Sequence, residues 1–289
     1  MKVVLFGAGG MLGHDLRTAC PAAVELLPLT HADVDVTDQR AVHTIIRGER
    51  PDVVINATGY TSVDAAESDS ETAFAVNGAA PGTIGQAARL VDAAVVHFST
   101  DYVFDGEAGR PYAEDVTPNP LNVYGRSKLE GEVRLQASGA ALLIIRTQWL
   151  FGLHGRSFPR TMWDRASRGE RTTVVADQTG RPTYTRDLAR AAWRLVSLGA
   201  RGMLHVANSG TATWYDLASR VFARAGTTEL LVPCSAAEYP TPARRPAAAV
   251  LDTRRFDQLT GGQMPRWEEA LDRFLAERTG TSALASSSA

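Results

Sequence analysis

The sequence predicts an α/β protein in which a doubly wound, Rossmann-type parallel sheet is joined to a smaller, interleaved C-terminal lobe. Three observations predict this class. Short apolar runs alternate with helical stretches over the first 150 residues. A glycine-rich turn joins the first run to the first helix, and polar motifs follow the ends of several later runs. Such alternation is typical of parallel strands joined by right-handed helical crossovers.

The elements of this sheet follow from apolar runs of strand length. Five runs fit strands, at residues 3–6, 24–29, 53–57, 94–99 and 142–146. Between them, helical stretches are expected at residues 40–47, 72–91 and 124–137. Because ligands of such sheets bind at the carboxyl ends of the strands, the motifs at these ends are expected to form one site.

The first strand ends in a glycine turn typical of a pyrophosphate site. Gly7, Gly10 and Gly13 follow the apolar run, and Met11 and Leu12 begin a helical pattern. A helix N-terminus offers free N–H groups and a positive dipole end, and glycines let the phosphates approach. The Gly7-x-x-Gly10-x-x-Gly13 spacing is one residue wider at the front than the usual dehydrogenase fingerprint. The turn predicts a dinucleotide cofactor, and a structural turn without a ligand is the alternative.

A tyrosine and a lysine four residues apart, Tyr124 and Lys128, lie on a predicted helix. At this spacing two side chains share a helix face, about 5–6 Å apart at Cβ. A free phenol has a pKa of about 10, and a neighbouring ammonium lowers it, which makes tyrosine a usable acid or base. This spacing is common by chance, but the glycine turn earlier in the chain strengthens the case that the pair is catalytic.

Beyond Phe151 the pattern is less regular. Residues 156–169 and 215–225 are expected to be helices, the latter opened by a capping box from Thr213 to Asp216. Extended segments are expected at residues 172–175 and 204–207, with a polar loop at 177–185. We expect a nucleotide-binding domain at 1–150, a substrate-binding lobe mainly at 151–279 and a disordered tail at 280–289.

Composition excludes several classes of protein. The 289 residues carry 30 basic and 32 acidic side chains without a basic run, so no nucleic-acid partner is expected. No apolar stretch has membrane-spanning length and no signal peptide is evident, so we expect a cytoplasmic protein without a membrane partner. The cysteines and histidines show no ligand spacing, so no metal is assigned; they include Cys20, Cys234, His14, His97, His154 and His205.

Several blocks in a fixed order carry a family resemblance. They include the glycine turn, Asp35-Val36-Thr37-Asp38, Thr100-Asp101-Tyr102-Val103-Phe104-Asp105-Gly106, Asp177-Gln178-x-Gly180-Arg181-Pro182-Thr183 and Arg245-Pro246. From Met1 to about Phe274 the chain resembles extended short-chain dehydrogenases/reductases, and more narrowly the dTDP-4-dehydrorhamnose reductases. The third and fourth blocks together are fairly specific to 4-ketohexose reductases.

The resemblance implies NADPH as cofactor, with NADH possible. The tip of the second strand, near Thr30 and His31, carries neither an acid for the 2′-hydroxyl nor an arginine for a 2′-phosphate, and Asp33 falls slightly past it. Residues from four segments are implied to bind the cofactor: Gly7, Gly10, Met11, Leu12, Gly13, Asp35, Val36, Ala57, Gly59, Tyr60, Thr61, Tyr124 and Lys128. Asp35 alternatively caps the following helix, a role also expected of Asp38.

The resemblance also implies the reaction, reduction of the C4 keto group of dTDP-4-dehydro-L-rhamnose to dTDP-L-rhamnose. Tyr124 would donate the proton, Thr100 would hold the oxygen, and Lys128 would bind the nicotinamide ribose and lower the tyrosine pKa. The implied substrate contacts are Thr100, Asp101, Tyr102, Trp149, Arg181 and Arg245. The partner would be a small-molecule dTDP-sugar, and the enzyme a monomer or homodimer. Asp15 matches an acidic position that binds magnesium at a dimer interface in some relatives, but nothing else in the sequence supports that metal.

Three alternatives share this scaffold. A related dTDP-4-keto-deoxysugar 4-ketoreductase of secondary metabolism would carry nearly the same motifs. A 4,6-dehydratase or epimerase would hold NAD⁺ tightly. A dehydratase also needs a second acidic residue directly after Asp101, and this chain has Tyr102 there. A non-catalytic, nucleotide-binding regulatory relative would not need Thr100, Tyr124 and Lys128 intact.

Overall fold

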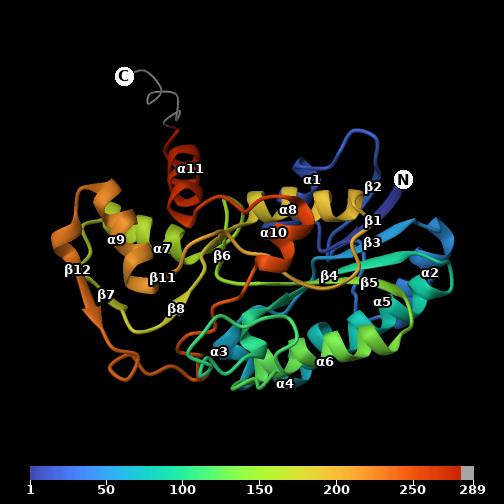
Figure 1. Ribbon diagram of the computed structural model, residues 1–289, viewed down its shortest axis with the longest axis horizontal. Coiled ribbons are helices and arrows are strands. Elements are labelled where there is room, and N and C mark those ends of the chain that lie inside the picture. The colour runs from blue at the N-terminus through green and yellow to red at the C-terminus, as the bar shows by residue number, and fades with distance from the viewer. Residues whose placement is uncertain (281–289) are drawn as a thin grey trace.

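The computed structural model describes residues 1–280 and contains a six-stranded parallel sheet. All but the first residue of the tail expected at 280–289 lies outside the described residues. The strand order is β10-β5-β4-β3-β1-β2 (Figure 1). The bounds are β1 Lys2–Phe6, β2 Glu25–Leu29, β3 Val53–Asn56, β4 Ala94–Thr100, β5 Ala141–Thr147 and β10 Gly202–His205. Every residue of β3 and β4 is buried, as expected for strands covered on both faces. The predicted doubly wound parallel sheet is confirmed.

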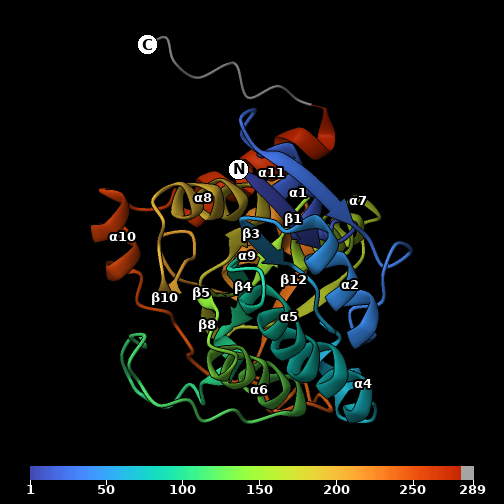
Figure 2. The same cartoon turned by 90° about the vertical axis from the view of Figure 1, so that its right-hand side faces the viewer.

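Helices cover both faces of the sheet (Figure 2). On one face lie α2 (Gln39–Glu49), α5 (Ala80–Arg89) and α6 (Val123–Ala137), whose apolar sides pack on Val4, Val54 and Ile144. On the other face lie α1 (Met11–Thr18), α8 (Thr185–Ser197) and α10 (Arg254–Thr260). Because all six strands run parallel, their carboxyl ends lie at one edge of the sheet, where the site forms.

The helix expected at 72–91 is interrupted. It consists of α4 (Ser70–Phe74), a π-helical turn (Ala75–Ala79) and α5, and it follows the short α3 (Val63–Ala66). The π-turn carries the buried Asn77, whose side chain has a role in the site. π-helical turns are frequent at functional sites.

The chain beyond β5 contributes to both parts of the molecule. Strand β10 pairs with β5 in the main sheet, and α8 packs on α1 through a hydrogen bond from Trp193 Nε1 to Leu16 O (2.8 Å). The polar loop expected at 177–185 instead contains β8 (Thr179–Gly180) and β9 (Thr183–Tyr184). β8 pairs with β11 (Ala212–Thr213) and β9 with β6 (Leu150–Phe151), segments that are distant in the sequence.

The remaining elements surround a separate core of Phe151, Phe222, Leu271 and Phe274. Figure 1 shows α7, α9 and their strands to one side of the sheet. The bounds are β6 Leu150–Phe151, α7 Phe158–Ser167, β7 Thr172–Val175, β11 Ala212–Thr213, α9 Trp214–Ala225, β12 Leu231–Cys234 and α11 Trp267–Thr279. The predicted capping box at Thr213 and Asp216 is confirmed at the start of α9.

Candidate functional site

The glycine turn packs so closely that two of its glycines have no room for a side chain. Gly7 has φ +83°, and a Cβ there would lie 2.7 Å from the carbonyl carbon of Ala57. A Cβ on Gly13 would lie 2.0 Å from Gly7 O. Gly10, the N-cap of α1, has extended backbone and no side-chain cap, so the first N–H groups of the helix are available to an anion.

A cavity of about 580 Å³ opens beside this turn. Seven of the residues predicted to bind the cofactor line it: Gly7, Gly10, Asp35, Val36, Ala57, Gly59 and Tyr60. Leu12 is buried in the core beneath the turn, so its backbone alone is left for a ligand. Gly13 serves the close approach of α1 to the turn, and Met11 and Thr61 do not line this cavity.

The tip of β2 presents no carboxylate to the cavity. The backbone N–H and hydroxyl of Thr30 donate to Asp33 Oδ2 at 2.8 and 2.7 Å, and these bonds lower the pKa of Asp33. Asp35 lines the cavity and accepts from Thr37. The N-cap of α2 is Asp38, so Asp35 does not cap that helix.

The free space at Gly10 allows a test of the pyrophosphate site. Among residues 1–280, a Cβ at Gly10 would meet only Gly7 O, at 3.4 Å. Gly10→Ala is therefore expected to keep its Tm but to raise the KM for NADPH about tenfold, a loss of about 1.4 kcal/mol. Gly48→Ala in α2, where nothing lies within 4 Å, is the matched control and should leave KM unchanged. An unchanged KM in Gly10→Ala would place the pyrophosphate elsewhere.

The three residues predicted to carry the chemistry meet at the carboxyl end of β4. Thr100 ends this strand, and Tyr124 and Lys128 lie one turn apart on α6. The Thr100 side chain lies close enough to that of Tyr124 to lower the pKa of the phenol. The helix begins here because Asn122 caps it, accepting from Gly125 N at 2.8 Å.

The pKa of Tyr124 moves in the direction opposite to the expected one. Burial raises it to about 12, and the nearby Thr100 side chain only partly opposes this rise. Lys128 does not lower it, because Nζ is buried and donates to the carbonyl of Phe98 at 2.6 Å. The tyrosine is therefore a phenol at neutral pH, the form that donates a proton.

A buried hydrogen-bond chain lies behind Lys128. Asn56 Oδ1 accepts from Thr58, so its Nδ2 faces His97 Nδ1 at 3.1 Å and the ring proton of His97 is assigned to Nε2. That Nε2 lies 3.4 Å from Lys128 Nζ, so an N–H faces the amine. Burial lowers the pKa of Lys128 to about 8.

The lowered Lys128 pKa predicts a pH-dependent stability. The unfolded chain holds this proton up to its ordinary pKa of 10.5, whereas the folded chain releases it near pH 8. Between these values the unfolded state binds more protons, so the contribution of Lys128 to stability rises with pH. We expect the free energy of unfolding of the wild type, minus that of Lys128→Met, to rise between pH 8 and 10.5 in urea titrations. A flat difference would mean that Lys128 is not buried as described.

Asp101, expected to touch the sugar, lies behind Thr100. It is 3% exposed and accepts from Thr100 Oγ1 at 3.0 Å and from Gln148 Nε2 at 3.3 Å. Burial raises the pKa of Asp101 to about 7. Gln148 also accepts from Leu251 N at 3.0 Å. In this arrangement Asp101 orients Thr100, and Gln148, which the sequence analysis missed, holds Asp101.

Trp149 is stacked on another tryptophan. Its ring lies 3.6 Å from that of Trp214, centroid to centroid, with 8° between the planes. A Cβ at Gly180 would lie 2.5 Å from the Trp149 ring, so the glycine of the fourth sequence block makes room for it. Trp149 itself has φ +49°, uncommon for a bulky residue, which is consistent with a functional position.

The two predicted arginines differ in their surroundings. Arg245 forms a two-bond ion pair with Asp64 (3.0 and 2.7 Å). Its guanidinium lies near Tyr102, whose ring contacts that of Tyr124 edge-on. Arg181 instead donates to Thr253 at 3.1 Å and does not line the cavity that Arg245 lines. The structure thus brings Arg245 to the site and leaves Arg181 outside it.

That second cavity, of about 720 Å³, extends from Arg245 into the smaller part of the molecule. Three arginines line it, Arg165, Arg244 and Arg245. Flat rings also line it, including Phe158, Trp214 and Tyr239. Guanidinium groups suit phosphate oxygens, and flat rings suit a nucleobase. The sequence analysis missed Arg165 and these three rings, because no motif marks them.

Asn77 joins the wall of the first cavity to α6 and was also missed. Its Oδ1 accepts from Tyr60 N at 2.8 Å, and its Nδ2 donates to Ser127 Oγ at 3.0 Å. It thereby ties the loop at Gly59 and Tyr60 to the helix that carries Tyr124. The only sequence signal was its place in the helical stretch, which reveals no such contact.

The parallel sheet, the glycine turn and the Thr100, Tyr124 and Lys128 group define an extended short-chain dehydrogenase/reductase. A family model described as RmlD substrate binding domain matches residues 1–279, and the chain belongs to this family.

Known proteins are similar to this chain over almost its whole length. A dTDP-4-dehydrorhamnose reductase of Burkholderia thailandensis is 36% identical, with 94% of this chain and 97% of the relative covered. A probable dTDP-4,6-dihydroxy-2-methyloxan-3-one 4-ketoreductase of Streptomyces antibioticus is 40% identical, with 94% and 93% covered. The crystal structure of dTDP-4-dehydrorhamnose reductase from Bacillus anthracis in complex with NADP has a TM-score of 0.92 and 34% identity, covering 96% of this chain and 99% of that one.

Proposed function

We propose that the chain reduces the C4 keto group of dTDP-4-dehydro-L-rhamnose to give dTDP-L-rhamnose, with NADPH as reductant. The observation that carries this proposal is the meeting of Thr100 and Tyr124 at the end of β4, where Tyr60 of the glycine-lined cavity packs in the same cluster as Tyr124. A second cavity is lined by arginines. Relatives named dTDP-4-dehydrorhamnose reductase and the NADP complex from Bacillus anthracis support it.

The residues around the first cavity fit NADPH. The close-packed turn at Gly7 and Gly13 leaves Gly10 and the α1 N-terminus free for the pyrophosphate. Thr30 and His31 line the cavity at the β2 tip, so the wall there offers a 2′-phosphate no carboxylate, whereas Asp35 lines the cavity further along the chain. When bound, NADPH supplies a hydride to the substrate.

The protein supplies the proton and the alignment. C4 of the sugar accepts the hydride as its oxygen takes the proton of the Tyr124 hydroxyl, so the carbonyl becomes an alcohol. Thr100 holds that oxygen, and Asp101 and Gln148 keep Thr100 in place. Lys128 would bind the nicotinamide ribose with an N–H that its bond to Phe98 O leaves free.

We propose that residues 1–150 chiefly bind the cofactor and residues 151–279 chiefly bind the nucleotide sugar. The diphosphate would lie against Arg165 and Arg245, and a ring such as Trp214 would face the thymine or the sugar. Trp149 acts by backing Trp214.

Arg165 offers a test of this lobe. Arg165→Gln is expected to raise the KM for the dTDP-sugar about tenfold, the loss of one charge-assisted hydrogen bond of about 1.5 kcal/mol, with little change in kcat. Arg168→Gln, on the same segment but paired with Glu170 outside the cavity, is the matched control. Steady-state kinetics at saturating NADPH measure both. Equal KM values in the two variants would move the diphosphate away from α7.

A second candidate is a 4-ketoreductase of another dTDP-4-keto-deoxysugar. The 40% identity to the Streptomyces antibioticus relative favours it. To separate the two, the 4-keto-L-sugar is generated enzymatically and reduced with NADPH, and the C4 configuration of the product is determined by NMR. The rhamno configuration supports the first proposal, and the opposite C4 epimer supports the second.

Among residues 1–280, no helix combines the length and apolar character needed to cross a bilayer. We propose a cytoplasmic enzyme that works as a monomer or homodimer. Sedimentation analysis would identify the oligomeric state.

A further inference from the structure

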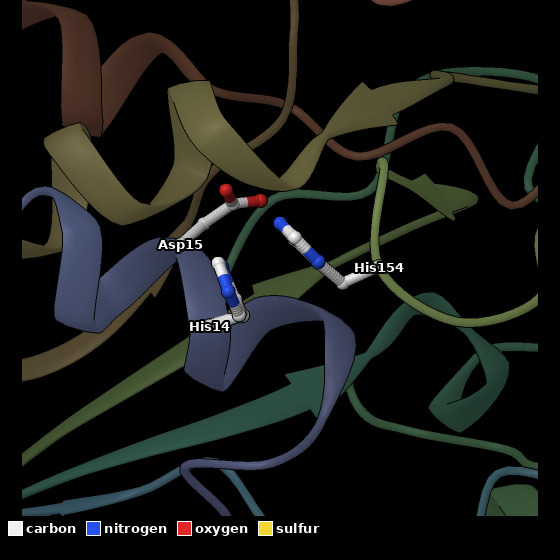
Figure 3. Close-up of side chains that lie close together, drawn as sticks. All are labelled: His14, Asp15 and His154. Atoms are coloured by element: carbon white, nitrogen blue, oxygen red, sulfur yellow. The ribbon is translucent and has the colours of Figure 1, made fainter. Parts of the chain in front are cut away.

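Three potential metal ligands that are far apart in the sequence come together outside both cavities. His14 and Asp15 lie on α1, and His154 lies on the loop after β6 (Figure 3). One ligand atom from each lies within 4.8 Å of the others. The two imidazole rings are stacked, with centroids 3.3 Å apart. Spacing in the sequence did not reveal this cluster, because the fold alone joins α1 to that loop.

The carboxylate of Asp15 has no cationic partner in the described part of the chain. It is 7% exposed, and its Oδ2 accepts from the buried hydroxyl of Thr185 at 2.5 Å. No ion pair involving Asp15 occurs within residues 1–280. Buried carboxylates are usually paired with a cation or coordinate a metal. A carboxylate that binds a metal usually also accepts a hydrogen bond from a neighbouring group, and Thr185 donates such a bond to Asp15.

One ring nitrogen of His14 is available for ligation. His14 Nδ1 is buried and has no hydrogen-bond partner among residues 1–280. A bound metal ion would satisfy this nitrogen, since imidazole nitrogens are common metal ligands.

We propose that His14, Asp15 and His154 form a binding site for a transition-metal ion such as Zn²⁺. Two imidazole nitrogens and one carboxylate oxygen suit Zn²⁺, with water in the fourth position. Mg²⁺ requires oxygen ligands in near-ideal octahedral geometry, so this mixed set selects against it. The three ligands belong to one chain, so the site needs no dimer interface.

The metal ion would link the loop after β6, through His154, to α1, through His14 and Asp15. A Cβ at Gly152 would lie 3.0 Å from Met11 Cγ, so this loop already rests on the turn that begins at Gly10. Because the ion binds the folded chain and not the separated ligands, it would raise the Tm.

The test uses the full chain after chelator treatment and dialysis. Calorimetry with Zn²⁺ is expected to show one ion per chain, and Co²⁺ is expected to give visible absorption bands of a four-coordinate ion. His14→Gln and His154→Gln should each weaken Zn²⁺ binding at least tenfold and abolish the rise in Tm, while their Tm without metal matches that of the wild type. His43→Gln, a histidine on α2, is the matched control.

Three results would overturn the proposal. The first is Zn²⁺ binding that is equal in wild type and in the His14→Gln, His154→Gln double variant. The second is an equal loss of binding in His43→Gln, and the third is Mg²⁺ binding as tight as Zn²⁺ binding. These measurements do not depend on turnover, so they stand whether or not the reductase activity is found.

Discussion

Replacing Tyr124 with phenylalanine is expected to reduce kcat by about 10²–10⁴-fold, the usual contribution of a positioned general acid. The substitution removes only the hydroxyl that donates the proton. Because the phenol is uncharged, with a pKa of about 12, removing it leaves the charge of the free site unchanged. The affinity for NADPH, measured by fluorescence titration, should therefore change little.

Tyr102→Phe is the matched comparison for that variant. Its ring lies 5.4 Å from that of Tyr124, and the same hydroxyl is removed from a neighbouring position. Its side chain interacts with Arg245, so we expect kcat to fall by about tenfold or less, about 1.4 kcal/mol. A Tyr124→Phe enzyme that retained most of its kcat, or fell no further than Tyr102→Phe, would contradict the role of Tyr124 as proton donor.

Removing the charge of Arg146 is expected to give the largest loss of stability. Arg146 on β5 and Glu132 on α6 are 4% and 2% exposed and form a two-bond ion pair at 2.9 and 2.6 Å. Ser99 also donates to Glu132 at 2.5 Å, so the pair ties α6 to two strands. Arg146→Met leaves a buried carboxylate unpaired, a cost of about 3–5 kcal/mol. Urea unfolding measures it.

The double variant Arg146→Met, Glu132→Leu distinguishes the loss of the ion pair from the cost of leaving one buried charge unpaired. Replacing both charges with apolar side chains is often neutral or stabilising, so the double variant should recover most of the lost stability. A single variant within about 1 kcal/mol of the wild type, the value typical of exposed pairs, would show that the pair is not buried.

Local chemistry was predictable from the sequence. The glycine turn, the Tyr124–Lys128 pair and the cap at Thr213 each depend on residues within one or two helical turns of each other. The fold class follows from the alternation of apolar, strand-like runs with helical stretches, which is visible in short-range sequence patterns. These features needed no knowledge of distant contacts.

Long-range contacts were not predictable in this way. The pair of Arg245 with Asp64 joins residues 181 positions apart. The stacking of Trp149 on Trp214 joins the link between β5 and β6 to the start of α9. The pKa of Tyr124 was expected to fall because Lys128 is near in sequence. It rises because burial dominates and the ammonium is bound to Phe98 O, and helical spacing reports neither fact.

The most direct test of the account is the fate of a labelled hydride. The enzyme is incubated with dTDP-4-dehydro-L-rhamnose and NADPH deuterated at the transferred position, and the product is examined by NMR. The account predicts one deuterium at C4 of dTDP-L-rhamnose for each NADPH oxidised, and a rate that collapses in Tyr124→Phe. Turnover without added NADPH, deuterium at another carbon, or oxidation equal in wild type and Tyr124→Phe would contradict it.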